Sequence, residues 1–439
     1  MFSLRSTACA LSALSVYLLL ATSSVSAAEP AVTTPPSLAA NHAIFNVVDF
    51  GTTGEGKVKD TAALQKALDT CAASGGGTVL VPPGVYLTGS LQIKSNTTLS
   101  LENKASLVGS SDLEDYPLAR IRWEGEFTEG HRALLWAEQA SHIAILGPGT
   151  IFGPPINLSK LRNPRAPALI EPSECTDVLL DGFTAQYQRM WAIHPVLCQG
   201  FIARNLTIRS VNTNGDGIDV DSCRDVTIER CTIDTGDDAI ALKSGRGLEA
   251  VRTGHPTENV LIKDCTLISS LYAGIGIGTE LSGGIRNVRI QNCTISGKGN
   301  GIVIKSRDGR GAAAENITGE NLFIFNSPTF LSIDLLKRGI QAKEPVPGAI
   351  EQWTQVRNLR FTAIKVHNVK QLVSATKIPA ERPLQGLVLT NVTGTCEQAI
   401  TLAHATDVAF SDINVTGFQG PLVTTEDVKG TGLNNPAAK

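Results

Sequence analysis

Eight acidic residues lie within the 32 positions from Asn214 to Gly245, in the stretch NGDGIDVDSCRDVTIERCTIDTGDDAIALKSG. Carboxyl groups that face one another can serve as a general acid and a general base, because each charge raises the pKa of its neighbour. The same residues could instead form turns, since Asp bonds to its own backbone and Gly tolerates positive φ. The elements that surround them decide between these interpretations.

Segments of alternating apolar and polar residues recur along the chain at intervals of 21 to 42 residues. Alternation is typical of strands that bury one face, and such a recurrence indicates a solenoid or a propeller. A propeller blade needs about 40–45 residues, which most intervals do not reach. We therefore predict an all-β fold, a single-stranded right-handed parallel β-helix. The segments are 177–185, 200–208, 225–233, 259–267, 287–295, 316–324, 358–366, 386–394 and 407–415.

Asp216 and the pair Asp237-Asp238 are about one repeat apart. In a parallel β-helix, one repeat brings equivalent positions onto neighbouring coils, about 4.7–4.9 Å apart. We therefore expect these three carboxyl groups to converge on one patch.

A short amphipathic helix is predicted after Asp60, and it would cap the N-terminal end of the solenoid. Leu64, Ala67, Leu68 and Cys71 follow the helical spacing, and the glycines at 75–77 end the pattern. Asp60 can serve as the N-cap. We expect one catalytic domain over residues 42–425 and a loose tail over 426–439.

The first 28 residues have the three-part layout of a secretory signal peptide, and residues 29–41 are expected to be flexible. No second apolar run is long enough to span a bilayer. Net charge is −3, which argues against nucleic acid as a partner. Eight cysteines follow the signal peptide, an even number that would usually indicate disulfides. Cys231, Cys265 and Cys293, however, share one position in successive repeats, so we expect them to stack as small buried residues.

Several segments resemble pectin-degrading β-helix enzymes, namely FNVVDFGTTGEGKVKDTAALQKALDTC and GGGTVLVPPGVYLTGSLQIKSNTTLSL. Four others narrow the resemblance to glycoside hydrolase family twenty-eight, the polygalacturonase and rhamnogalacturonase family: WAIHPVLCQGFIARNLTI, NGDGID, IDTGDDAIALKSG and IGTELSGGIRNVRIQNC. The resemblance runs from about residue 44 to about residue 325. It implies a right-handed β-helix with a cleft along one side. It also implies metal-free hydrolysis of glycosidic bonds in pectin, with inversion.

The resemblance also implies roles for the acids. The family's Asn-Thr-Asp reads Asn214-Gly215-Asp216 here, and its Asp-Asp reads Asp237-Asp238. Asp237 would then be the general acid, while Asp216 and Asp238 would hold and deprotonate the water. In inverting glycosidases the two carboxyl groups are about 6.5–9.5 Å apart. Asp219 and Asp221 are expected on the outward side, with a structural role favoured over a catalytic one.

Two family positions differ. The family's Gly-His-Gly aligns with Leu271-Tyr272-Ala273, and its Arg-Ile-Lys aligns with Val303-Ile304-Lys305, so a histidine and an arginine are absent. The substrate-binding candidates are Lys305, Asn214, Tyr272, Arg307, Glu280, Lys243 and His194. A surface or structural role is the alternative for Lys305, Lys243, Glu280 and His194.

We therefore expect a secreted, monomeric glycosidase, extracellular or periplasmic, with no cofactor and no metal. It would cleave α-glycosidic bonds of pectic polysaccharide with inversion, in the manner of a polygalacturonase. The two departures favour a shift toward rhamnogalacturonan or another modified pectin. A polysaccharide lyase or epimerase and a non-catalytic carbohydrate-binding β-helix are the alternatives, because fold does not fix function.

Overall fold

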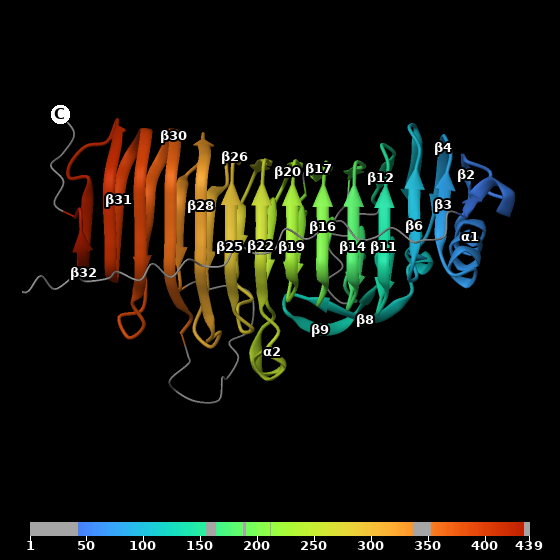
Figure 1. Cartoon of the computed structure of the whole chain (residues 1–439), viewed down its shortest axis with the longest axis horizontal. Helices are drawn as coiled ribbons and strands as arrows, with labels where there is room; N and C mark the ends of the chain where they lie inside the picture. Colours follow the sequence, from blue (N-terminus) through green and yellow to red (C-terminus); the bar gives the residue numbers. More distant parts are fainter. Residues whose placement is uncertain (1–42, 155–163, 188–189, 211, 337–352, 434–439) are drawn as a thin grey trace, which may run out of the picture.

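The computed structural model describes residues 43–154, 164–187, 190–210, 212–336 and 353–433. The predicted signal peptide (1–28) and flexible segment (29–41) lie outside these residues. Strands of successive repeats pair in parallel and wind around one long axis (Figure 1). The predicted all-β class and parallel β-helix are confirmed.

Three faces make up each coil. The first face consists of β1 (Ile44–Asn46), β3 (Gly77–Val81), β6 (Thr97–Leu101), β11 (Ser141–Leu146), β14 (Thr176–Asp181), β16 (Gln199–Arg204), β19 (Arg224–Glu229), β22 (Thr257–Lys263) and β25 (Ile285–Gln291). The second consists of β2 (Glu55–Lys59), β4 (Gly84–Thr88), β7 (Ala105–Gly109), β12 (Thr150–Phe152), β15 (Thr184–Gln186), β17 (Thr207–Ser210), β20 (Thr232–Thr235), β23 (Thr266–Ser269) and β26 (Thr294–Gly297).

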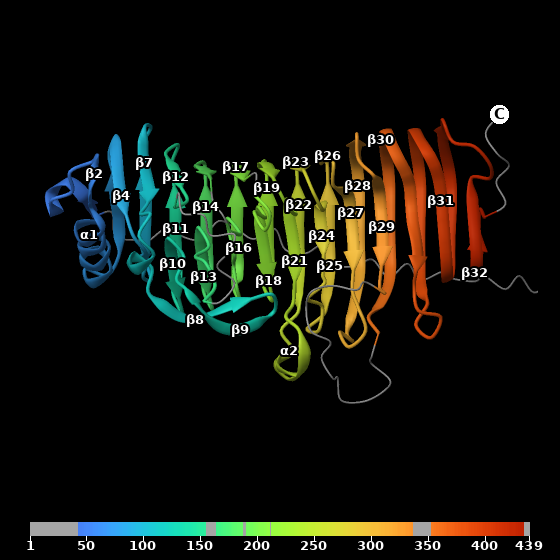
Figure 2. The same ribbon diagram turned by 180° about the vertical axis from the view of Figure 1, so that it is seen from behind.

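The third face is seen in Figure 2 and positions the candidate site. It consists of β5 (Leu91–Gln92), β10 (Leu135–Glu138), β13 (Ile170–Ser173), β18 (Ile218–Asp221), β21 (Ile240–Lys243), β24 (Ala273–Ile277), β27 (Asn300–Lys305) and β29 (Thr329–Asp334). Toward the C-terminal end, β28 (Ala313–Phe325), β30 (Gln355–Lys377) and β31 (Leu384–Thr416) run on around the corners, and β32 (Val423–Thr431) is the last strand.

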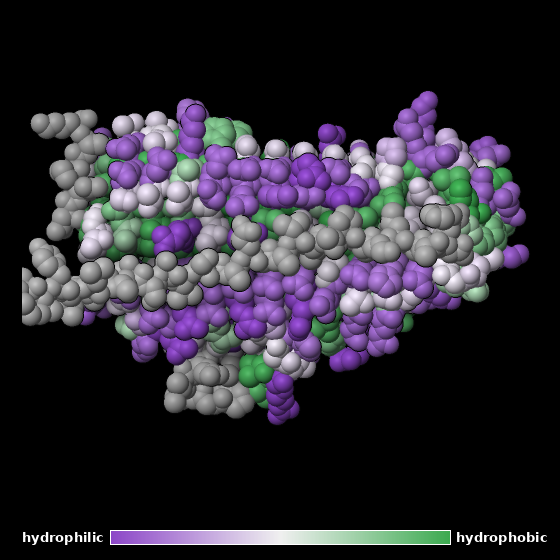
Figure 3. All heavy atoms as spheres, viewed as in Figure 1, coloured by the Kyte–Doolittle hydropathy of each residue, from purple (hydrophilic) through white to green (hydrophobic). Residues whose placement is uncertain are grey.

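The sequence repeats align in the structure as predicted. Val178 pairs with Phe201, Phe201 with Val226, and Val226 with Val260, so equivalent apolar residues stack along the interior. Alternate residues face outward, and polar side chains cover much of the first face (Figure 3). Burial of the inward-facing apolar side chains is the main source of stability in such a stack.

The cysteines form part of this interior. Cys265 contacts Cys231 and Cys293 on the neighbouring coils, as the shared position predicted. All eight cysteines of the described residues are buried and unbridged. They therefore pack as small apolar residues, and burial raises the pKa of the Cys396 thiol to about 11.

The helix α1 (Thr61–Ala73) covers the N-terminal end of the solenoid with its buried residues Leu64, Ala67, Leu68 and Cys71 (Figure 1). Asp60 occupies the N-cap position, but its side chain does not cap the helix. It accepts hydrogen bonds from the backbone N–H groups of Thr53 at 2.7 Å and Gly54 at 3.2 Å instead. Two short 3-10 helices, η1 (Val47–Phe50) and η2 (Leu113–Asp115), complete this end.

The C-terminal boundary differs from the expected one. The expected tail begins at residue 426, whereas β32 continues to Thr431 and pairs with β31. Most side chains of β32 are exposed, so this edge strand carries little of the apolar alternation from which a strand is predicted.

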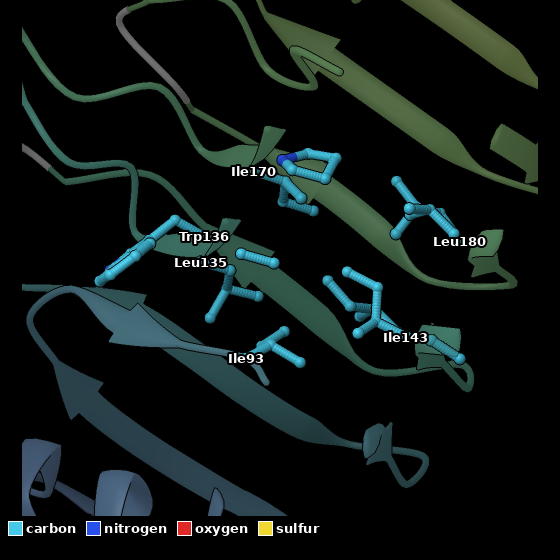
Figure 4. A pocket seen from close by; sticks show the side chains of 11 residues that line it. Ile93, Leu135, Trp136, Ile143, Ile170 and Leu180 are labelled. Atoms are coloured by element: carbon cyan, nitrogen blue, oxygen red, sulfur yellow. The ribbon is translucent and has the colours of Figure 1, made fainter. Parts of the chain in front are cut away.

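Two elements interrupt the coils beside the third face. An antiparallel hairpin, β8 (Leu118–Trp123) with β9 (Glu126–His131), runs along the lower edge in Figure 2, and α2 (Gly247–Thr253) follows β21. A small apolar cavity lies inside the solenoid, lined by Ile93, Leu135, Ile143, Ile170 and Leu180 among others (Figure 4). No helix of the described residues is both long and apolar enough to cross a membrane.

The interior stack generates a stability prediction. Ile262 is completely buried in β22, so Ile262→Ala should lower the free energy of unfolding by about 2–5 kcal/mol through lost burial and a cavity. The adjacent outward residue Lys263 pairs with Glu229 at 2.9 Å, and Lys263→Ala should cost at most about 1 kcal/mol. Urea denaturation of both variants measures the difference, and equal midpoints would contradict the assignment of inward and outward faces.

Candidate active site

Two adjacent coils bring the three predicted catalytic carboxyl groups together. Asp216 precedes β18, and Asp237 and Asp238 precede β21 on the next coil. The backbone N–H of Gly217 donates to the carbonyl of Asp238 at 3.0 Å, which fixes the two loops side by side. One carboxylate oxygen from each of the three aspartates lies within 4.8 Å of the others, and all three residues are buried.

The limit on these oxygen-to-oxygen distances is not directly comparable with the expected carboxyl separation. Carboxyl groups of inverting glycosidases are about 6.5–9.5 Å apart, and those of retaining glycosidases about 5–5.5 Å. The 4.8 Å limit here applies to one oxygen of each carboxyl group and is not the separation between whole carboxyl groups. Distance alone therefore does not favour inversion over retention at this site.

Hydrogen bonds hold Asp237 in one orientation. Its carboxylate accepts from the backbone N–H of Asn214 at 3.2 Å and of Asp238 at 2.9 Å. The hydroxyl groups of Thr235 and Ser269 donate to the Asp237 carbonyl at 2.9 and 2.7 Å. Burial, followed by the negative charge of Asp238, raises the pKa of Asp237, and a raised pKa suits a proton donor.

Asp238 has a cation as its partner. The ammonium of Lys305 donates to Asp238 Oδ2 at 2.7 Å. Gly276, on the following coil, lies against the same carboxylate, where an added Cβ would be 2.5 Å from Oδ2. The absence of a side chain at Gly276 is therefore what leaves room for Asp238.

Asp219 faces outward from the solenoid between the core residues Ile218 and Val220, as expected, but it is completely buried and belongs to the same acidic group. It lies on β18, and burial raises its pKa to about 7, although the positive charge of Lys243 opposes the shift. Burial, then the charges of Asp219 and Asp237, raise the pKa of Asp216 well above its usual range. Alternation alone places Asp219 outward on its strand, but it does not reveal what covers that face.

Asp221 is also buried rather than solvated. Its carboxylate accepts from Arg122 Nε at 3.0 Å, and Arg122 belongs to the hairpin strand β8. The same guanidinium lies 3.3 Å from Glu249 of α2. Asp221 is therefore an anchor for the hairpin, as a structural role implies.

Three of the substrate-binding candidates form a buried charged row. Lys243 Nζ lies 3.5 Å from Asp219 Oδ1 and 3.5 Å from Glu280 Oε2. His194 Nδ1 lies 3.0 Å from Glu171 Oε2, and both side chains are buried. Lys243, Glu280 and His194 thus contact protein groups.

The other candidates are more open. Tyr272 is 43% exposed, and its ring centroid lies 5.6 Å from Lys305 Nζ. Asn214 is half-buried and contributes its backbone N–H to Asp237, as described above. Arg307 lies 3.6 Å from Asp308 on the same connection. Val303, at the position of the family's arginine, is only 7% exposed.

Two aromatic residues at the site were not predicted from the sequence. The ring of Trp191 lies 4.7 Å from the His194 ring and 4.8 Å from Lys243 Nζ. Trp123, at the end of β8, packs against Trp191 with ring centroids 4.2 Å apart. Trp191 stands in the WAIHPV motif and could have been suspected, but nothing local connects Trp123 with residues almost seventy positions later.

Three carboxylates this close together could also bind a cation. Lys305 already supplies a positive charge at 2.7 Å from Asp238, so the cluster has its own counter-charge and we assign no metal to it.

Comparison with known proteins agrees with this geometry. Residues 71–335 match the family model of glycosyl hydrolases family 28. The chain is 30% identical to a probable polygalacturonase of Vitis vinifera over 79% of this chain and 73% of that protein. It is 26% identical to an exo-poly-alpha-D-galacturonosidase of Dickeya chrysanthemi, over 63% of this chain and 54% of the other.

Solved structures show the same architecture. The crystal structure of a hyperthermoactive exopolygalacturonase from Thermotoga maritima superposes with a TM-score of 0.74 and 25% identity. The match covers 91% of this chain and 94% of that one. It agrees with the predicted right-handed sense of the β-helix. The chain belongs to glycosyl hydrolases family 28 and is a glycosidase.

Proposed function

We propose that this protein hydrolyses α-glycosidic bonds of a pectic polysaccharide with inversion of the anomeric carbon. The observation that carries the proposal is the convergence of Asp216, Asp237 and Asp238, with oxygens within 4.8 Å, beside the ammonium of Lys305. Membership of the family and the polygalacturonases among the relatives support the substrate class. We also propose that the protein is secreted through residues 1–28 and acts as a monomer.

In the proposed reaction, Asp237 donates its proton to the leaving glycosidic oxygen. Two backbone N–H groups hold its carboxyl group in place, and burial favours the protonated form. Asp216 and Asp238 orient a water molecule and accept its proton as its oxygen bonds to the anomeric carbon. Lys305 donates to Asp238 Oδ2 at 2.7 Å and so places a positive charge directly beside this carboxylate.

Lys305 and Tyr272 are the groups we propose to contact the sugar. The exposed ring of Tyr272 beside Lys305 offers an apolar surface next to a single positive charge. Such a pair suits a substrate in which an acidic unit adjoins a neutral sugar face, such as the methyl side of rhamnose. Val303 is almost completely buried, so we do not expect its side chain to contact the sugar. Its main effect is that the arginine which the family carries at this position is missing.

The acid assignment predicts the effect of Asp237→Asn. Asn is nearly the same shape but cannot donate a proton to the leaving oxygen, so turnover should fall by about 10²–10⁴-fold. Steady-state rates on the best pectic substrate measure this, with the circular dichroism spectrum as a check on folding. Near-normal rates in a folded variant would show that another group is the acid.

Inversion predicts the configuration of the first product. NMR of the anomeric proton early in the reaction should show the opposite configuration to the bond cleaved, and EDTA should leave the rate unchanged. A first product of retained configuration would reject the water-activation scheme. Unsaturated products that absorb in the ultraviolet, with activity restored by calcium, would indicate a lyase.

The two departures predict substrate preference. Val303 stands where the family has an arginine. Without that guanidinium, a galacturonate carboxylate loses a charged hydrogen bond of about 1.5–3 kcal/mol, so polygalacturonate should be a weak substrate. We expect a higher kcat/KM on rhamnogalacturonan or another modified pectin. Val303→Arg should reduce the difference in kcat/KM between the two substrates by raising kcat/KM on polygalacturonate. A clear preference of the unaltered protein for plain polygalacturonate would reject the specificity argument and leave the hydrolase assignment intact.

A further inference from the structure

The side chain of Lys243 is buried inside the protein beside the acidic cluster and does not project toward solvent. Its ammonium lies 3.5 Å from Asp219 Oδ1 and 3.5 Å from Glu280 Oε2, and all three side chains are at least nine-tenths buried. From these contacts we infer that Lys243 is a positioning residue whose positive charge favours the ionised form of the acidic cluster, rather than a residue that binds substrate. The inference rests on the proposed hydrolysis and the role given there to Asp216.

Aromatic side chains cover Lys243. The Trp191 ring lies 4.8 Å from its ammonium, and Trp123 of the hairpin packs on Trp191. A sugar carboxylate could reach the ammonium only by displacing these rings or the two carboxylates. Lys305, in contrast, lies next to an exposed ring, and so it remains the better substrate-binding candidate.

The hairpin tip closes the same region from another direction. Gly125 approaches Glu280 so closely that an added Cβ would be 2.9 Å from Glu280 Cγ. The carbonyl of Gly125 accepts from the backbone N–H of Arg246 at 3.0 Å, and the Arg246 side chain pairs with Glu126. Glu280 is thus held between the hairpin and the coil, which in turn fixes the distance between its carboxylate and Lys243.

Charge balance explains why a buried cation is needed. Six buried carboxyl groups lie in or next to the cluster, whereas its ammonium groups are those of the buried Lys243 and the half-buried Lys305. The carboxyl groups are those of Glu171, Asp216, Asp219, Asp237, Asp238 and Glu280. His194 faces Asp219 from the preceding coil, and Glu124 faces Glu280 and Lys243 from the hairpin tip, near Arg165 and Arg246.

These groups determine in which direction the loss of the Lys243 charge changes the pKa of Asp216. Burial and the neighbouring carboxylates raise the pKa of Asp216 and of Asp219, while the charge of Lys243 lowers both. Loss of that charge would raise both pKa values further, so Asp216 would stay protonated to a higher pH. A protonated Asp216 cannot accept the proton of the attacking water, and the rate would fall at low pH and recover at higher pH.

The test is the pH dependence of kcat/KM for Lys243→Met on the best pectic substrate. We expect the acidic limb of the profile to move upward by about one pH unit or more, which is about a tenfold loss at a pH below the limb. KM measured at the pH optimum of each protein should change less than about threefold, because the ammonium does not contact the sugar. Lys243→Arg keeps the charge and should leave the limb closer to its original position.

Glu280→Gln provides a matched variant for which we expect the opposite shift of the acidic limb. It removes the carboxylate that competes for Lys243, so the limb should move to lower pH. If Lys243→Met does not fold, as judged by circular dichroism and thermal unfolding, the direction of the shift in Glu280→Gln decides the matter. An unmoved limb in Glu280→Gln overturns the inference.

A raised KM with an unmoved limb in folded Lys243→Met also overturns the inference and assigns Lys243 to substrate binding. The proposed function is tested separately, on the unaltered protein. A retained or unsaturated first product rejects that function, and the positioning role with it. An inverted product together with unmoved limbs rejects the positioning role alone.

Discussion

The spacing between successive coils is the constraint on which the rest of the structure depends. Backbone hydrogen bonds between parallel strands hold neighbouring coils about 4.7–4.9 Å apart. This spacing stacks Val178, Phe201 and Val226 into one interior column, and it brings Asp216 within reach of Asp237 and Asp238. The same bonds that build the core therefore also bring the backbones that carry these acids side by side.

Acids brought this close together, and buried, need compensation. Burial of a charge costs free energy unless the charge is paired or protonated. The protein uses both solutions: Lys305 and Lys243 lie next to Asp238 and Asp219, while burial raises the pKa of Asp216, Asp219 and Asp237. A group of carboxyls with unequal proton affinities is what acid–base chemistry at a single site requires.

The hairpin β8–β9 is the element that turns an outward face into a buried site. In a bare solenoid, the outward residues of β18 and β21 would be in contact with water. The hairpin brings Trp123 and Arg122 onto this face, where Arg122 pairs with Asp221 and Trp123 packs on Trp191. By excluding water, the hairpin strengthens every charge interaction that it covers. An element outside the repeats therefore controls the electrostatics of residues that belong to the repeats.

The sequence by itself determined the coil architecture, because each repeat carries its own alternation and the intervals between repeats set the register. The same intervals separate three stacked buried residues whose alignment was not predicted. Glu171, His194 and Asp219 are separated by 23 and 25 residues, as are the repeats that begin at 177, 200 and 225. The family motifs located the acidic cluster for a similar reason, since its members lie one coil apart.

Only the tertiary structure decided which outward residues are buried and what they contact. Asp219 and Asp221 look alike in the sequence, yet the first faces Lys243 and the second anchors Arg122, which is 99 residues away. The alternation of a strand separates inward from outward positions, but it does not say whether another segment covers the outward ones. That depends on insertions such as residues 118–131, whose contacts are far away in the sequence and arise only when the chain has folded.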